Sequence, residues 1–165
     1  GAGAGGASFV PPSAGRAAPS GDSSARAARR GVTRGTTKAH LCRAVLESIA
    51  LESYDLVKTM EQESGTPIPE LRVDGGASRS RFLMQYQADI LDSKVCRPQC
   101  LETTALGSAM MAGLTVGVWD SMEELASIWK ENAVFQPDYA PARRKADLAR
   151  WHEGVQRSMG WAKGQ

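Results

Sequence analysis

The sequence contains 165 residues and carries a formal net charge of +2. This length suits one domain with a sizeable core or a part of a larger protein, and the near-balanced charge argues against a nucleic-acid binder as a whole. No segment approaches the roughly 18 apolar residues that a membrane-spanning helix needs, so we expect no membrane span. The first 15 residues lack the basic and apolar stretches of a secretory signal, and three cysteines, an odd number, suit a reducing cytoplasm.

The N-terminal segment differs from the rest of the chain in composition. Residues 1–35 are dominated by Gly, Ala, Ser, Pro and Arg, and Phe9 is their one aromatic residue. Five arginines stand against one aspartate, which gives this segment a net charge of +4. Ordering a chain costs conformational entropy, and the small apolar surface of this segment cannot offset that cost. The composition therefore predicts that the segment is mostly disordered on its own. Without interleaved aromatic residues, the arginines do not indicate a nucleic-acid site.

The first regular element is predicted to be a long helix that begins at Thr36 or Thr37 and ends before Gly65. A threonine hydroxyl can accept a hydrogen bond from an unpaired amide of the first turn, and a glycine followed by prolines ends a helix. Apolar residues recur at helical spacing along it and predict the face that packs on the core. These residues are Leu41, Val45, Ile49, Leu56 and Met60, and Ala44 and Leu46 widen the apolar stripe.

Short strands and helices alternate after residue 66, which predicts an α/β fold. Ser121 and Glu124 have the spacing of a capping box at a helix start. Near the C-terminus, Trp151 and Trp161 are expected to be core anchors on the last helix. The predicted strands are 71–73 and 94–98, and the predicted helices are 82–91, 103 or 104 to about 118, and 142–161.

The turn at Gly75-Gly76 is the feature that points most directly to chemistry. Glycines after a strand let the backbone approach a ligand closely, because no Cβ intervenes. A helix that starts immediately afterwards offers unpaired amides and a positive dipole end, which suit a nucleotide. The same pattern also describes a plain tight turn capped by the carboxylate of Asp74, so both interpretations stay open. No metal site is predicted, since Cys96 and Cys100 lack a second pair of ligands.

The segment Leu71-Arg72-Val73-Asp74-Gly75-Gly76-Ala77 resembles the adenosine motif of actin-like ATPases, which include the sugar kinases. Together with the segments that surround it, this motif resembles the glycerol kinases of the FGGY carbohydrate kinase family. The resemblance covers about residues 8 to 161 and is strong after residue 31. Further matching segments are Thr33-Arg34-Gly35-Thr36, Phe82-Leu83-Met84-Gln85, Arg97-Pro98, Glu102-Thr103-Thr104-Ala105-Leu106-Gly107, Phe135-Gln136-Pro137 and Arg157-Ser158-Met159-Gly160-Trp161.

The resemblance implies the fold and a nucleotide site. The expected fold is the C-terminal part of an actin-like (ribonuclease H-like) ATPase lobe, with a sheet flanked by helices. Residues 1–30 are then a low-complexity, disordered segment, and residues 31–165 are a partial FGGY kinase C-terminal domain. The implied nucleotide-binding residues are Gly75, Gly76 and Ser80. Ser80 stands where the family has an asparagine, and one weakened hydrogen bond lowers ADP affinity by up to about tenfold.

The resemblance also implies the activity of a parent enzyme. That activity is the ATP-dependent phosphorylation of glycerol to glycerol 3-phosphate, with ATP/ADP and Mg²⁺ as cofactors. The family's catalytic aspartate lies in a Gly-Asp-Gln segment, which does not occur here. We therefore predict no catalytic residue in this chain, a missing N-terminal lobe as its partner, and no turnover by the chain alone. Whether the chain forms homo-oligomers stays open.

Three alternatives remain at this point. The chain could derive from another FGGY sugar kinase, such as a pentose or gluconate kinase, because these share the lobe. It could also be a non-catalytic interaction module that docks on a full-length kinase. An incomplete gene product without a function is the third alternative.

Overall fold

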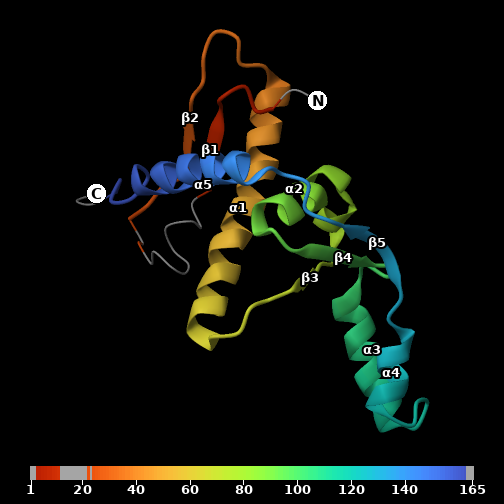
Figure 1. Cartoon of the computed structure of the whole chain (residues 1–165). Coiled ribbons are helices and arrows are strands. Elements are labelled where there is room, and N and C mark those ends of the chain that lie inside the picture. The colour runs from red at the N-terminus through yellow and green to blue at the C-terminus, as the bar shows by residue number, and fades with distance from the viewer. Residues whose placement is uncertain (1–2, 12–21, 23, 163–165) are drawn as a thin grey trace.

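The computed structural model describes residues 3–11, 22 and 24–162. Two small sheets lie on either side of the long helix α1 (Lys38–Ser64), and helix α5 (Pro141–Gln156) crosses α1 (Figure 1). In the larger sheet the strand order is β3-β4-β5, with β3 and β4 parallel and β4 and β5 antiparallel. The smaller sheet is the antiparallel pair β1-β2. The strands are β1 Ser8–Val10, β2 Ala28–Arg30, β3 Glu70–Arg72, β4 Lys94–Pro98 and β5 Glu131–Phe135, and the helices are α1 Lys38–Ser64, α2 Arg81–Leu91, α3 Thr103–Thr115, α4 Met122–Ile128 and α5 Pro141–Gln156.

Strands β1 and β2 lie inside the segment for which composition predicts disorder, so that expectation is wrong for these strand residues. Small side chains allow the segment to approach the helices closely. Val10 is buried, and a Cβ at Gly154 of α5 would lie 3.2 Å from its side chain. Residues 12–21 and 23 lie outside the described residues. The division of the chain at residue 30 stays a prediction.

The ends of α1 agree with the sequence analysis, but its buried face does not. Thr37 accepts a hydrogen bond from the amide of His40, and Gly65 ends the helix in the left-handed conformation. Four of the five residues of the predicted core face are 38–52% exposed; they are Val45, Ile49, Leu56 and Met60. Ala44, at the edge of the predicted stripe, is buried as expected, but the helix otherwise buries a neighbouring face of mostly small or polar residues, namely Glu47, Ser48, Ala50, Leu51 and Val57. These short side chains let α2 pack closely, and the side-chain amide of Gln87 donates to the carbonyl of Ala50 over 3.2 Å.

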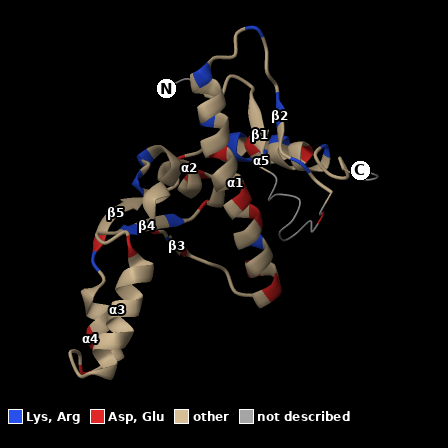
Figure 2. Cartoon of the chain, turned by 180° about the vertical axis from the view of Figure 1, so that it is seen from behind, with Lys and Arg blue, Asp and Glu red and all other residues tan. Residues whose placement is uncertain are grey.

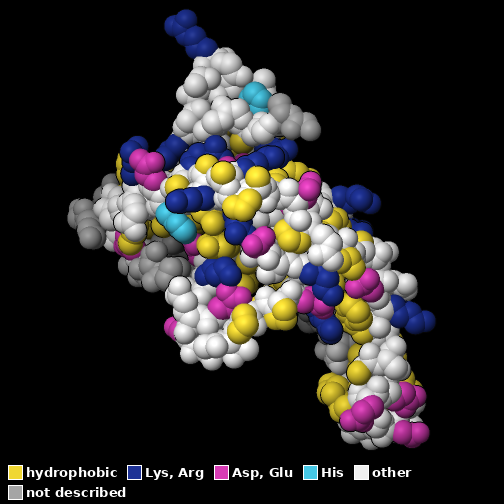
Figure 3. Space-filling view, in the orientation of Figure 1, with side chains coloured by type: hydrophobic (Ala, Val, Ile, Leu, Met, Phe, Trp, Pro, Cys, Tyr) yellow, Lys and Arg dark blue, Asp and Glu magenta, His cyan; other side chains and the backbone are white. Residues whose placement is uncertain are grey.

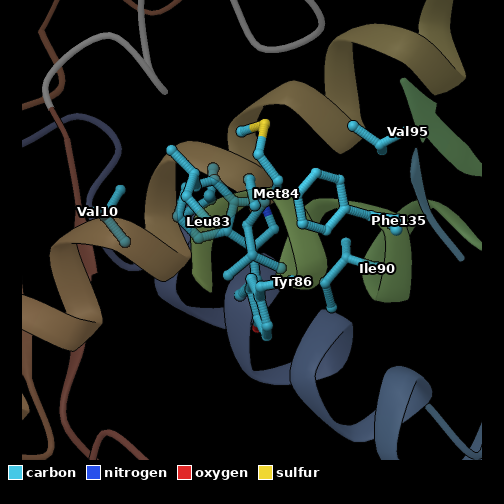
Figure 4. Close-up of a cluster of buried hydrophobic side chains, with 12 residues drawn as sticks. Val10, Leu83, Met84, Tyr86, Ile90, Val95 and Phe135 are labelled. Carbon is cyan, nitrogen blue, oxygen red and sulfur yellow. The ribbon is translucent and has the colours of Figure 1, made fainter. Parts of the chain in front are cut away.

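The hydrophobic core lies where α1, α2 and α5 meet the larger sheet (Figure 4). Helix α2 contributes the largest share, including Leu83, Tyr86 and Ile90, while Val95 and Phe135 reach in from β4 and β5. On α5, Trp151 is buried as predicted, and Val155 is buried as well. The other predicted anchor is wrong: Trp161 is 71% exposed, because α5 ends at Gln156 and the chain leaves the core before reaching it.

Helices α3 and α4 form an arm that projects from the larger sheet (Figures 1 and 3). The buried residues of this arm are Gly113 in α3 and Leu125 in α4. Large hydrophobic side chains on the arm and its connecting loop are 48–76% exposed; they are Met111, Val116, Val118 and Met122. None of the helices in the described part of the chain is both long and apolar enough to span a membrane.

Candidate functional site: the diglycine turn after β3

The chain leaves β3 and enters a turn that is fixed by backbone hydrogen bonds. The amide of Val73 donates to Cys96 on β4 over 3.0 Å, and the amide of Gly75 donates to Leu101 over 2.8 Å. Gly75 has φ +73°, a conformation that residues with a Cβ rarely adopt. Its carbonyl accepts two bonds from Ser78, one from the amide at 3.2 Å and one from the hydroxyl at 2.7 Å. The turn is therefore held to both β4 and the segment that precedes α3.

Gly76 opens a short 3₁₀ helix, Gly76–Arg79, and is exposed. A Cβ placed on Gly76 would meet no heavy atom within 4 Å. The lack of a side chain here is therefore not required by packing within the described residues. It leaves the backbone of Gly76 exposed, and contact between Gly76 and a nucleotide stays a prediction.

Ser80 has a structural role that the sequence analysis did not identify. It is the N-cap of α2, and its hydroxyl accepts a hydrogen bond from the amide of Leu83 over 3.2 Å. Serine and asparagine are about equally good at this position, so the side chain that stands in for the family's asparagine still starts the helix. Contact between Ser80 and a nucleotide stays a prediction.

Two small open pockets border the turn, and Val73 and Asp74 line both of them. One, of about 260 Å³, is lined by these residues together with Ala77 and parts of α1 and α2. The other, of about 240 Å³, is lined by the same two residues, Pro98, Thr103 and Trp129. The site is thus an open surface with shallow hollows. Such a surface suits one side of a ligand whose other side is covered by further protein.

A larger cavity of about 840 Å³ lies away from the turn, between the C-terminal half of α1 and α5. Several charged side chains on its wall are already engaged in ion pairs. Lys58 pairs with Glu61, and Arg144 pairs with Asp92. We therefore base the site on the turn and not on the size of this cavity.

The surroundings of the turn are basic. Arg72 lies on β3, Lys94 and Arg97 lie on β4, and Arg79 and Arg81 flank the N-cap of α2. Figure 2 shows basic segments along β4. Arg79 and Arg81 are exposed. Arg72 and Lys94 are both paired with Glu70, so the positive charge that favours an anionic ligand here comes from Arg79 and Arg81. Within the part of the chain that the structure describes, no group of three or more His, Cys, Asp and Glu residues could hold a metal ion.

Arg97 contacts the turn directly, which the sequence analysis missed. Its Nη1 donates to the carbonyl of Ser78 over 2.9 Å, and its Nη2 donates to the side-chain oxygen of Asn132 on β5 over 2.8 Å. The Arg97-Pro98 pair was visible in the sequence as a family-like segment. Its contact with the turn was not, because it joins Arg97 to carbonyls 18 and 19 positions earlier in the chain.

Comparison with known proteins gives consistent matches. The family described as "FGGY family of carbohydrate kinases, C-terminal domain" matches residues 1–116. A glycerol kinase of Saccharolobus islandicus (strain L.S.2.15 / Lassen #1) is 52% identical over 159 residues, which are 96% of this chain and 32% of that relative. The chain thus spans about a third of the length of the curated relatives it matches.

Solved structures agree with the fold. The crystal structure of Plasmodium falciparum glycerol kinase with ADP matches with a TM-score of 0.82 and 34% identity, covering 94% of this chain and 31% of that one. Gluconate kinase from Lactobacillus acidophilus matches with a TM-score of 0.74 over 98% of this chain and 33% of that one. At 23% identity, the second likeness concerns the fold alone.

Proposed function

Because the chain belongs to the FGGY family of carbohydrate kinases, we propose that it forms the C-terminal nucleotide-binding part of a glycerol kinase. The parent reaction is the transfer of a phosphoryl group from ATP to glycerol, which gives ADP and glycerol 3-phosphate. The observation that carries the proposal is the bare backbone at Gly76, which faces open space after a strand end and beside basic side chains. As the substrate, glycerol is favoured over a sugar because relatives at 52% identity are named glycerol kinases.

In this proposal an adenine nucleotide lies against Gly75 and Gly76, with Ser80 at its edge. Arg79 and Arg81 are exposed and can approach its phosphates. Unchanged ADP binding in an Arg79→Ala, Arg81→Ala double variant would remove that contribution. The Mg²⁺ of such a reaction is usually held by the phosphates of the nucleotide and by one or two carboxylates, and we assign none of the described residues to it.

The chain is proposed to work as one part of a two-lobed kinase. The exposed apolar residues of α1 and of the α3–α4 arm are the kind of surface that further polypeptide covers. The relatives are about three times as long. We expect the isolated chain to show no glycerol-dependent ADP release, and a rate on the usual enzyme scale of about 1–100 s⁻¹ would contradict this. Free thiols at Cys42, Cys96 and Cys100 favour the cytoplasm as its compartment.

Calorimetry with ADP tests the nucleotide site. A Gly76→Val variant fills the open space without a clash inside the described chain, so its free energy of unfolding should stay within about 0.5 kcal/mol of the unchanged chain. Its ADP affinity should fall at least tenfold, because the side chain would occupy the place of the nucleotide. Ala109→Val, on the exposed surface of α3, is the matched control and should bind ADP normally. Equal ADP binding by Gly76→Val and the unchanged chain would contradict the site.

A second function is favoured by the exposed arm. A chain that presents Met111, Val116, Val118 and Met122 to solvent could dock onto a full-length kinase as a non-catalytic module. Size-exclusion chromatography with and without an intact glycerol kinase distinguishes the two functions. A shift of this chain into the kinase peak supports the interaction module, and separate elution argues against it.

A further inference from the structure

The side chain of Arg97 lies between the diglycine turn and strand β5. Its Nη1 donates to the carbonyl of Ser78 over 2.9 Å and to the carbonyl of Arg79 over 3.5 Å. On its other edge, Nε and Nη2 both donate to Oδ1 of Asn132, over 3.2 and 2.8 Å. The guanidinium carbon also lies 5.7 Å from the ring centre of Phe135. One planar group therefore holds the turn to the edge of the sheet.

The carbonyls that Arg97 contacts belong to the last two residues of the 3₁₀ helix Gly76–Arg79. The carbonyl end of a helix carries partial negative charge, which a cation stabilises. The other bonds of this short helix are local: the amides of Ser78 and Ser80 donate to Gly75 and Ala77. Arg97 supplies a contact from a residue that is distant in the sequence, and its rigid fork of donors fixes orientation as well as distance.

We propose that Arg97, held by Asn132, is a positioning residue that keeps the diglycine turn in the conformation that accepts a nucleotide. This inference rests on the proposed function, because it concerns the same site. Arg97 acts through the backbone and not by touching the ligand. Gly76 has no side chain to anchor the turn, and even a Cβ placed on it would meet no heavy atom within 4 Å.

Three variants separate positioning from general stability. Arg97→Met keeps the apolar stem over Phe135 but removes every donor. Asn132→Leu removes the acceptor that orients the guanidinium, whereas Asn132→Asp retains an acceptor in the same place. Arg143→Met is the matched control, because the guanidinium of Arg143 likewise lies over an aromatic ring, 3.8 Å from the centre of Tyr139, and belongs to α5.

The first measurement needs no nucleotide. Amide hydrogen exchange of Ser78 and Ser80 should accelerate about tenfold in Arg97→Met, by the loss of a charge-assisted bond. The amides of the core helix α2 should exchange at the rate of the unchanged chain. Asn132→Leu should give a smaller acceleration, while Asn132→Asp and Arg143→Met should give none. Exchange of Ser78 and Ser80 that stays unchanged in Arg97→Met would overturn the role of Arg97.

The second measurement is calorimetry with ADP on the same proteins. Arg97→Met should bind ADP about three- to tenfold more weakly, and Asn132→Asp should bind it as the unchanged chain does. Equal ADP affinity in Arg97→Met and the unchanged chain would also overturn the inference. If the chain joined to its missing lobe gives no heat with ADP, the proposed function is overturned instead, and the exchange measurement then still decides whether Arg97 orders the turn.

Discussion

Nε1 of Trp151 donates a hydrogen bond to Oδ2 of Asp55 over 2.7 Å and so joins α5 to the middle of α1. Trp151 is 3% exposed, which leaves its indole little access to water if this partner is lost. The other oxygen of Asp55 lies 2.9 Å from Nε2 of His152, whose side chain is half exposed. A single carboxylate thus anchors two neighbouring residues of the C-terminal helix.

Removing that carboxylate should destabilise the chain measurably. We expect Asp55→Ala to lower the free energy of unfolding by about 1–3 kcal/mol, because it leaves a buried N–H unsatisfied. Asp55→Asn keeps an acceptor and should cost less. His152→Ala is the control, since exposed pairs contribute about 0–1 kcal/mol. Urea unfolding measures all three, and an Asp55→Ala that costs no more than His152→Ala would contradict the prediction.

The sequence predicted the elements whose ends carry local signals. Thr37 and Gly65 mark the limits of α1, and Pro98 ends β4, because a cap or a missing amide acts within one turn of the chain. Strand β5 was missed because its existence depends on pairing with β4, in the register Val95 to Phe135. The buried face of α1 was predicted wrongly for the same reason. Contacts with α2 and β1 determine which face is buried, and the sequence of α1 alone does not reveal those contacts.

The features of the candidate site also differ in whether a local sequence pattern or a distant contact determines them. The turn at Gly75-Gly76 could be predicted because a diglycine after a strand is a local pattern. The capping role of Ser80 was missed although a serine just before a helix is itself a recognised signal. The contact from Arg97 to the turn joins residues 18 and 19 positions apart and depends on Asn132 as well. No spacing rule predicts a contact of that kind.

Glu70 and Lys94 are register partners on β3 and β4 and form an ion pair. The hydrogen bond from Lys94, followed by that from Arg72, lowers the pKa of Glu70 to about 2. In an unfolded chain a glutamate titrates near 4.3. The pair therefore contributes stability above about pH 4.3, and this contribution is lost as the pH falls towards about 2.

Glu70→Gln should remove this acid dependence. Its unfolding free energy should approach that of the unchanged chain as the pH falls from about 4.5 to 2, because only the unchanged chain loses the pair. Urea unfolding at several pH values measures this, with Glu63→Gln at the exposed end of α1 as the control. Curves for Glu70→Gln and the unchanged chain that stay parallel over this range would contradict the prediction.

Tyr86 should make the chain sensitive to alkali. Burial, and then the charge of Asp147, raises the pKa of its hydroxyl, which donates to Asp147 over 3.3 Å. An unfolded tyrosine ionises near pH 10, so stability is unaffected below about pH 10 and falls above it, where only the unfolded chain ionises. Tyr86→Phe should therefore lose less stability than the unchanged chain above pH 10. An equal loss, measured by urea unfolding, would argue against this.

Ser80 allows its two roles to be separated. Ser80→Ala should lower the free energy of unfolding by about 1 kcal/mol, because the amide of Leu83 loses its partner. Ser80→Asn keeps the cap and should remain within about 0.5 kcal/mol, while its longer side chain raises ADP affinity by up to about tenfold. Unfolding curves and calorimetry measure the two effects. An ADP affinity that is the same in Ser80→Asn and the unchanged chain would limit Ser80 to capping.

Gly113 and Gly107, both in α3, should respond to alanine in opposite directions. A Cβ at Gly113 would lie 2.2 Å from the indole ring of Trp119, whereas one at Gly107 meets nothing within 4 Å. Gly107→Ala should therefore stabilise the helix by about 0.5–1 kcal/mol, the usual gain of alanine over glycine.

Gly113→Ala must instead displace the ring and should cost about 1–3 kcal/mol. Because the α3–α4 arm projects from the body, the loss should be confined to it. Faster amide exchange along α3 and a shifted indole NMR signal of Trp119 would register that loss, while the exchange of α2 stays constant. Gly107→Ala should slow amide exchange in α3. If Gly113→Ala slowed it as well, the prediction that close packing of Gly113 against Trp119 stabilises the arm would be contradicted.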